Sequence, residues 1–223
     1  MTQAKKAKPK RGAGRPRGDE SDLRASLLDA AIAVYARAGI GATSLRAIAS
    51  EAGVTPAMLH YYFGDKDRVT QALVDERLLP ALAPVRARLE QVGDDPMELA
   101  QAFVRGIGAL VAEHPWLPPL WVREVLCEGG ALREVLFHKA LPNLPRLLAQ
   151  RFAAARADGR LNPALDPRLL VVSLVGLTLF PAAGAPIWRA VFEASDIDAG
   201  TLLRHTLALL GGGLAATPSG ESS

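Results

Sequence analysis

The segment TSLRAIASEAGVTPAMLHYYFG, residues 43–64, decides the fold of this chain. Thr43 or Ser44 can cap a short helix at its start, and Gly53 ends that helix. Apolar residues on it recur at i, i+3, i+4 and i+7, which puts them on one helical face: Leu45, Ile48, Ala49 and Ala52. The first half of the segment therefore predicts a short helix packed on one side.

A second helix follows within the same segment. Thr55 can cap it, and Pro56 suits its first position, where the missing N–H would have no helical partner in any case. Gly64 closes this helix. Two helices joined by the short turn Ala52-Gly53-Val54 form a helix-turn-helix.

The sequence of the second helix indicates which of its faces points inward and which points outward. Leu59 and Phe63 lie one turn apart, so both should face the core. The outer face then carries Ala57, His60 and Tyr61, flanked by Pro56 and Met58. An exposed face with two ring side chains and almost no charge is a poor solvated surface, which indicates that it binds something.

The rest of the chain predicts an all-α fold. Apolar spacing indicates a helix from Ser21 to Ala38, ended by Gly39, and no strand-length alternation of Val, Ile and Thr occurs. Further helices, separated by proline and glycine, are predicted at about 65–91, 97–113, 119–128, 132–158, 167–180 and 199–210. The glycine-rich residues 211–223 are expected to fray.

Charge is distributed unevenly along the 223 residues. The net charge is +3, but residues 1–18 carry four Lys and three Arg without an acid, so residues 19–223 sum to −4. Residues 1–18 predict a disordered basic arm that either binds polyanions or only aids solubility. No apolar signal segment follows the early lysines, and the single cysteine, Cys127, suits a reducing compartment, so a cytoplasmic protein is expected.

An uncharged run from Leu169 to Trp188 has the length of a membrane span. Pro181, Gly184 and Pro186 are expected to break it after Phe180, which leaves a helix too short to cross a bilayer. Such a helix normally lies in a protein core or at a subunit interface, so we expect no membrane.

At residues 27–73 the chain resembles the TetR family of bacterial repressors. The resemblance rests on E-A-G-V-T ahead of L-H-Y-Y-F and then D-K-D. It implies an N-terminal helix-turn-helix domain that binds double-stranded DNA, followed by a helical domain that binds a small effector and dimerises. The corresponding boundaries here are residues 19–68 and 69–210, before a disordered tail at 211–223.

The resemblance also implies which residues contact an operator. The expected contacts to bases, groove and phosphates come from Thr43, Ser44, Arg46, Thr55, Pro56, Ala57, Met58, His60, Tyr61, Tyr62 and Lys66. The family often has Lys-Gly or polar residues where this chain has Pro56-Ala57, so hydrogen-bonded readout from that turn should be thin. Tyr62 adjoins the inward Phe63 and is about as well placed for packing as for DNA.

Residues 19–68 carry five basic and seven acidic side chains, so this domain alone would not attract DNA by charge. The basic arm must supply that attraction. Its Gly14-Arg15-Pro16-Arg17-Gly18 is similar to the core of AT-hook segments, in which arginines lie in a narrow minor groove. Arg15 and Arg17 are therefore further DNA-binding candidates, and a merely solubilising tail is the alternative.

The effector and dimer surfaces are expected in the C-terminal part. Pocket walls are expected from Phe103, Ile107, Trp121 and Phe137, with Glu124 and His138 as polar anchors, although rings also simply fill cores. By resemblance, the last two long helices form a four-helix interface in a homodimer. Its candidate residues are Leu169, Val172, Ser173, Gly176, Phe180, Leu203, Leu207 and Leu210.

The sequence therefore predicts a transcriptional repressor that binds a palindromic operator as a dimer and is released by a small, largely apolar effector. No metal-ligand spacing, nucleotide loop or catalytic motif stands out, so no catalytic residue, metal or cofactor is expected. Two alternatives stay open. One is a sequence-independent architectural DNA binder that uses the basic arm, and the other is an all-α enzyme.

Overall fold

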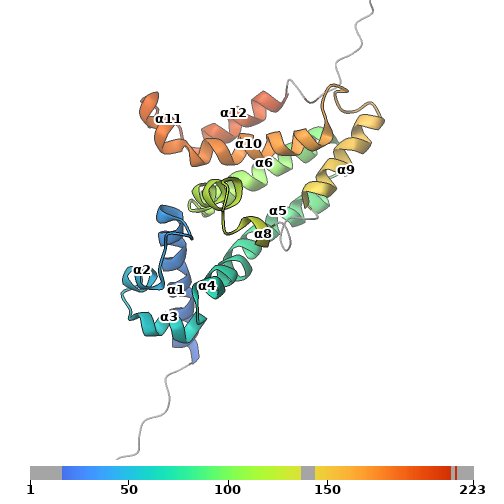
Figure 1. Cartoon of the computed structure of the whole chain (residues 1–223). Helices are drawn as coiled ribbons and strands as arrows, with labels where there is room; N and C mark the ends of the chain where they lie inside the picture. Colours follow the sequence, from blue (N-terminus) through green and yellow to red (C-terminus); the bar gives the residue numbers. More distant parts are fainter. Residues whose placement is uncertain (1–16, 137–143, 212–213, 215–223) are drawn as a thin grey trace, which may run out of the picture.

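The computed structural model describes residues 17–136, 144–211 and 214, and Figure 1 shows their arrangement. All the regular elements in this described part are helices, which confirms the predicted all-α class. A small group of helices at one end of the molecule connects to a larger group, across which α10 and α12 lie (Figure 1). One continuous hydrophobic core extends through both groups.

The small group consists of α1 (Arg17–Ala38), α2 (Leu45–Glu51) and α3 (Pro56–Phe63). Residues 17–63 are called the head below. Helix α1 begins at Arg17 rather than at the predicted Ser21, so the last two residues of the expected arm are helical. Residues 1–16, the rest of that arm, lie outside the described residues.

A nearly continuous helical run leads from the head into the larger group, which is called the body. It consists of α4 (Lys66–Leu73), the π-helical segment η1 (Val74–Leu78) and α5 (Leu79–Gln91), as predicted for residues 65–91. The wider turn of η1 directly precedes Pro80, and the Leu79 N–H bonds the Val74 carbonyl five residues back. Pro80 has no N–H to offer the preceding turn, which favours such an irregularity at this point.

The body continues with α6 (Pro96–Glu113), α7 (Leu117–Trp121), the π-helical η2 (Val122–Leu126), α8 (Arg133–Val135) and α9 (Leu144–Ala157). These match the predicted helices at 97–113 and 119–128. The predicted helix at 132–158 corresponds to α8 and α9, and residues 137–143 between them lie outside the described part.

The chain ends with α10 (Pro167–Ala183), α11 (Ala185–Val191) and α12 (Ala199–Gly211). The expected break after Phe180 is wrong, because Pro181 lies inside α10 and the helix reaches Ala183. A proline so near the end removes only one late hydrogen bond. The chain instead bends by 67° between α10 and α11, and the Trp188 indole donates to the Pro181 carbonyl across the bend at 2.8 Å.

Among the described residues, no single helix is long and apolar enough to cross a membrane. The bent pair α10 and α11 reaches the required length and composition together. Helix α10 packs against α6, α7, α9 and α12, so the inner side of this apolar helix is covered by the chain's own core.

The expected fraying from residue 211 needs correction at two positions. Gly211 still belongs to α12, and Leu214 is buried in the core. The Leu214 carbonyl also accepts a hydrogen bond from the Asn162 amide at 3.1 Å. An apolar side chain with a core site to fill holds this part of the chain in place. The other residues beyond Gly211 lie outside the described part.

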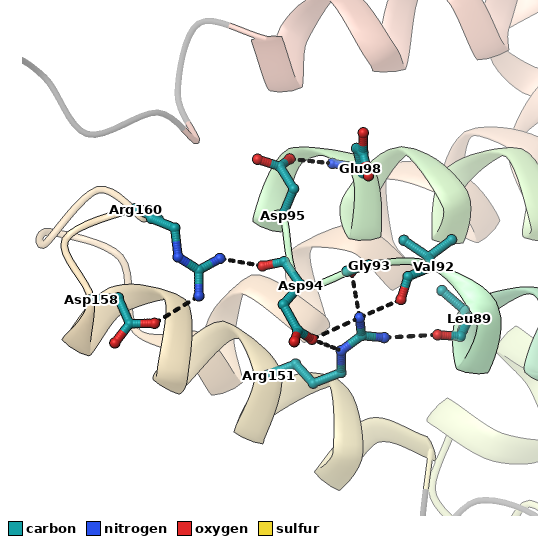
Figure 2. A network of polar contacts seen from close by, with 9 residues as sticks. All are labelled: Leu89, Val92, Gly93, Asp94, Asp95, Glu98, Arg151, Asp158 and Arg160. Carbon is teal, nitrogen blue, oxygen red and sulfur yellow. Dashed lines mark hydrogen bonds and ion pairs between the residues drawn. The ribbon is translucent and has the colours of Figure 1, made fainter.

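An arginine network fixes the end of the body that lies far from the head (Figure 2). Arg151 on α9 donates to the carbonyls of Leu89 at 2.8 Å and Val92 at 2.6 Å, where α5 ends. It also donates to the Gly93 carbonyl and pairs with Asp94 at 3.0 Å. A single side chain therefore satisfies several helix-end carbonyls and ties α9 to the α5–α6 turn.

Replacing Arg151 with Met is expected to lower the free energy of unfolding by about 2 kcal/mol, because several hydrogen bonds from a charged donor are removed. The Arg151 side chain is only 16% exposed. Arg156→Met is the matched control, since the Arg156 side chain is exposed on the same helix and has no hydrogen bond or ion pair within the described residues. Urea unfolding of both variants measures the difference. Equal decreases in stability would contradict the role given to Arg151.

Candidate functional site

Helix α2 begins as the sequence predicts, with Ser44 as its cap. The Ser44 hydroxyl oxygen accepts a hydrogen bond from the Ala47 N–H at 3.2 Å. Thr43 behaves differently from expectation, because it is buried and its hydroxyl donates to the Gly39 carbonyl at 2.6 Å. The expected phosphate contact by the Thr43 side chain is therefore corrected to a structural bond that closes the turn after α1.

Helix α3 confirms the predicted inner face, since Leu59 and Phe63 are both buried. Thr55 precedes it with an extended backbone, but its side chain makes no capping hydrogen bond. The Thr55 side chain is exposed, so its hydroxyl is available to an outside partner. Thr55 is therefore the N-cap residue of α3 as predicted, but its side chain does not supply the capping hydrogen bond.

The outer face of α3 carries the residues that the pattern placed there. Pro56, Ala57, His60 and Tyr61 are exposed, and Met58 is half-buried. The Tyr61 ring is 74% exposed and stands at right angles to the Tyr62 ring, 5.2 Å between ring centroids.

Tyr62 is half-buried and packs against the core. Its carbonyl accepts a hydrogen bond from Arg24 of α1 at 2.9 Å. The Arg24 guanidinium also lies 4.4 Å above the centre of the Phe63 ring and pairs with Glu76 of η1. Arg24 thus holds the end of α3 against both α1 and η1. No sequence pattern indicates this role, because the partners of Arg24 are distant in the chain.

The two expected cations beside the helix-turn-helix differ in availability. Arg46 on α2 is exposed, and its side chain has no hydrogen bond or ion pair within the described residues. The Lys66 ammonium donates to the carbonyls of Ile40 and Gly41 at 3.2 Å each. Lys66 therefore stabilises the turn after α1, and only one N–H of its ammonium group is left for a phosphate. Arg17 lies in α1, and Arg15 lies outside the described residues.

Glu124, expected as a polar anchor for an effector, has a different role. It lies on η2, is buried, and accepts hydrogen bonds from the Ile40 N–H at 2.9 Å and the Ala131 N–H at 3.0 Å. Its neighbour Arg123 donates to the Arg37 carbonyl at 2.7 Å. Because both carboxylate oxygens are occupied, Glu124 joins the body to the end of α1 instead of lining a pocket.

A second buried polar group lies near this joint. Tyr35 of α1 is fully buried, and burial raises the pKa of its phenol, with the nearby Asp67 and Glu124 charges acting in the same direction. The Tyr35 hydroxyl is buried without a hydrogen-bond partner among the described residues, and the Thr70 hydroxyl near it donates to the Lys66 carbonyl at 3.0 Å. The interior between α1, α4 and η2 is therefore polar at its centre and apolar around it.

The remaining pocket candidates are partly brought together. Phe103 and Ile107 lie one turn apart on α6 and are both buried in the core. Trp121 on α7 is half-buried, and its indole N–H is buried without an acceptor among the described residues. Phe137 and His138 lie outside the described residues.

The expected dimer residues divide between two faces. On α10 the exposed positions form one stripe: Leu169, Val172, Ser173, Gly176 and Phe180. On α12 the expectation is corrected, because Leu210 is buried and Leu203 and Leu207 pack against the chain's own core. The exposed large apolar residue of α12 is Leu209, which the sequence pattern did not separate from its inward neighbours.

The exposed apolar surface also continues onto α11 and the residue after it. Ile187, Val191 and Phe192 are each more than two-thirds exposed. A groove of about 300 Å³ opens between α10 and α12, with Leu169, Ser173 and Leu209 in its lining. Contiguous apolar surface of this kind usually marks an interaction site.

The helix-turn-helix and its surroundings match the family described as bacterial regulatory proteins, tetR family, over residues 27–73. Residues 27–73 are therefore a TetR-family domain. The match covers α1 from Leu27 through α4, which is most of the head together with the helix that follows it. It confirms the resemblance that E-A-G-V-T and L-H-Y-Y-F indicated.

Similarity to named transcriptional regulators extends beyond the head. The chain is 27% identical over 181 residues to the HTH-type transcriptional regulator RutR of Escherichia coli strain K12, which covers 80% of this chain and 82% of that protein. The comparisons indicate transcriptional regulators and no enzyme family. Transcription regulation by DNA binding is therefore the general function of this chain.

Solved structures share the whole fold. The ketosteroid transcriptional regulator KstR2 of Mycobacterium tuberculosis has a TM-score of 0.71 at 20% identity, covering 93% of this chain and 100% of that one. AibR in complex with isovaleryl coenzyme A and operator DNA has a TM-score of 0.67 at 18% identity, covering 84% and 97%. At these identities the likeness establishes the fold alone.

Within the TetR-family head, Gly39 is required by geometry. Its φ is +87°, and a Cβ there would lie 2.9 Å from the Arg123 Cδ and 3.1 Å from the Glu124 Oε1. Gly39→Ala is expected to lower the free energy of unfolding by about 1–2 kcal/mol. Gly41→Ala is the control, because nothing lies within 4 Å of a Cβ at that position. Thermal unfolding compares the two, and an equally stable Gly39 variant would contradict the need for glycine here.

Proposed function

We propose that this chain is a ligand-responsive repressor that binds a palindromic operator as a homodimer. The observation that carries the proposal is the outer face of α3, where exposed ring side chains stand on a helix anchored by buried Leu59 and Phe63. A recognition helix in this position enters the major groove with its N-terminal residues at base edges. Family membership gives this face its partner, double-stranded DNA.

The proposed DNA contacts surround that face. Tyr61 and His60 supply polar groups toward the groove, while Pro56, Ala57 and Met58 supply apolar surface suited to thymine methyl groups. Phosphate contacts fall to the exposed Ser44, Arg46 and Thr55, with the remaining N–H of Lys66. The Thr43 side chain makes no DNA contact in this proposal, because its hydroxyl donates to the Gly39 carbonyl. Tyr62 contributes mainly by packing against the core.

The homodimer is supported by the stripe on α10. Leu169, Val172 and Phe180 are each more than 60% exposed, which is costly for a helix of this composition left in water. Ser173 and Gly176 on the same stripe allow a facing helix to approach closely. A two-fold partner covering this stripe would present two copies of α3 to successive turns of DNA.

The effector is proposed to be a small, largely apolar molecule held beside α6 and α7. The buried indole N–H of Trp121 supports an effector that carries a hydrogen-bond acceptor, because buried donors are normally paired. One structural neighbour is a ketosteroid regulator, which is consistent with an apolar effector, and another is a complex with isovaleryl coenzyme A, in which only the short acyl group is apolar.

The route from effector to DNA is proposed to run through α7 and η2. Trp121 ends α7, and Glu124 follows three residues later with its bond to Ile40 in the head. An effector that displaces Trp121 would also displace Glu124, and through it the end of α1. The effector then favours a head position that misfits the operator, which is a population shift. The α4–η1–α5 run, with Pro80 and Pro84, would flex in response.

A release assay tests the proposal. A fluorescent duplex obtained by selection from a random pool is bound to the protein in excess unspecific DNA, and compounds are screened for lowering its anisotropy, beginning with isovaleryl coenzyme A and a ketosteroid. Trp121→Phe should keep operator affinity and lose sensitivity to a compound that releases the wild type. Failure of every compound class would contradict ligand response, while sensitivity of the bound duplex to unspecific competitor would favour the architectural alternative.

The basic arm is proposed to supply the non-specific attraction to DNA. Deleting residues 2–16 removes six Lys and Arg. The logarithm of operator affinity should then fall less steeply with the logarithm of salt concentration, by up to about 0.9 for each phosphate contact removed. Deleting residues 216–223 is the control. An unchanged slope after the arm deletion would show that the arm does not contact DNA.

A further inference from the structure

The His60 ring is held in one orientation by the end of its own helix. Its Nδ1 lies 2.6 Å from the Gly64 carbonyl oxygen. A carbonyl oxygen can only accept a hydrogen bond, so Nδ1 must carry the proton. A neutral imidazole has a single N–H, and the other ring nitrogen, Nε2, is therefore an acceptor.

The backbone around Gly64 keeps this carbonyl in place. Gly64 ends α3 with φ +82°, a conformation that favours glycine, and its N–H donates to the His60 carbonyl at 2.9 Å. His60 and Gly64 thus bond each other twice, once through the backbone and once through the ring. The acceptor character of Nε2 follows from the local backbone.

The other exposed side chains on this face are not fixed as hydrogen-bond donors or acceptors. Pro56 and Ala57 have no polar side-chain atom. Tyr61 carries a hydroxyl that can rotate and either donate or accept, so it tolerates both kinds of base edge. Among the exposed side chains on the outer face of α3, His60 therefore offers the hydrogen-bonding group that can discriminate between base edges.

We propose that His60 determines specificity by accepting a hydrogen bond from an exocyclic amino group in the major groove, either N6 of adenine or N4 of cytosine. These amino groups are the donors that the major groove presents. Guanine O6 and N7 and thymine O4 are acceptors and would repel Nε2. The proposal rests on the proposed function, because it requires α3 to lie in the major groove.

Base analogues test the proposal directly. Selection with wild type and with His60→Ala locates the position in each half-site at which the two preferences differ. Wild type should prefer one base pair in one orientation there, and the amino-bearing base of that pair, adenine or cytosine, is the one to replace. Replacing that base by purine or 2-pyrimidinone removes the amino group, and this should weaken wild-type binding by about three- to tenfold. His60→Ala should show no further decrease in affinity, which separates the contact from weaker base pairing.

Two further experiments test the same contact. Inosine in place of guanine removes only a minor-groove amino group and should leave the His60 contact unaffected. His60→Arg replaces the acceptor by a fork of donors and should move the preferred base at that position to guanine. Circular dichroism of both variants checks that the exposed substitution leaves the helices intact.

The outcomes separate this inference from the proposed function. Unchanged wild-type affinity after removal of the amino group, or an equal decrease in wild type and His60→Ala, would overturn the acceptor role. A pool that yields no inverted repeat would instead overturn the proposed operator binding. An inverted repeat, together with an amino-group effect that is present in wild type and absent in His60→Ala, supports both.

Discussion

Replacing Val172 and Phe180 by glutamate is expected to convert the protein into monomers and to weaken operator binding by about a hundredfold or more. Both side chains are exposed on the α10 stripe, 65% and 71% respectively. Around a two-fold axis the new carboxylates would face their copies across an apolar contact, where unpaired charges are costly. Once the two subunits separate, each head binds its half-site alone and the advantage of linked binding disappears.

Sedimentation velocity and fluorescence anisotropy measure the two effects on the same preparations. The matched control is Gln150→Glu with Ala154→Glu, which adds two carboxylates at exposed positions of α9. That variant should keep the mass and the operator affinity of the wild type. A Val172/Phe180 variant that stays dimeric with full affinity would contradict the position of the interface on α10.

Replacing Glu124 by alanine is expected to loosen the head on the body. The change leaves the N–H groups of Ile40 and Ala131 without their acceptor, at a cost of about 1–3 kcal/mol for each that stays buried. A loosely held head no longer fixes the separation of the two α3 helices. Operator affinity should therefore fall about tenfold, and the preference for one half-site spacing should relax.

A series of operators with the half-sites moved by one or two base pairs measures this effect. Wild type should bind one spacing far better than its neighbours, and Glu124→Ala should bind several comparably. Glu128→Ala is the control, since Glu128 is exposed just beyond η2. A decrease in affinity by the same factor at every spacing would contradict the positioning role of Glu124 and indicate general destabilisation.

Local pattern predicted the head well for physical reasons. The spacing of Leu59 and Phe63 and the glycine at 64 are enough to orient α3, because a helix face follows from its own sequence. Ser44 was predictable as a cap, since its partner lies three residues away. The outer face of α3 could therefore be identified before the fold was known.

Contacts that join distant segments were not predictable in the same way. Glu124 is an acid in an apolar stretch, and its partner Ile40 lies 84 residues away. Lys66 has the position of a phosphate contact, yet backbone carbonyls of the turn after α1 take its ammonium. Backbone partners leave no trace in side-chain patterns.

Helix α12 shows a second limit of pattern. Leu203, Leu207 and Leu210 share the spacing of an interface, but that spacing serves equally well to face the chain's own core. Thr206 is buried between them, and its hydroxyl is satisfied within the helix because it donates to the Leu202 carbonyl. Which apolar face turns inward depends on neighbouring helices, and these are fixed only by the tertiary fold.

Selection of bound DNA from a random pool with the purified full chain is the decisive test of dimeric operator binding. We predict enrichment of an inverted repeat whose half-site centres lie one helical turn apart, about 10–10.5 base pairs, or a multiple of that. Each bound duplex should carry an even number of chains. Enrichment of no repeat, or of a single half-site bound by one chain, would contradict a dimeric operator-binding regulator.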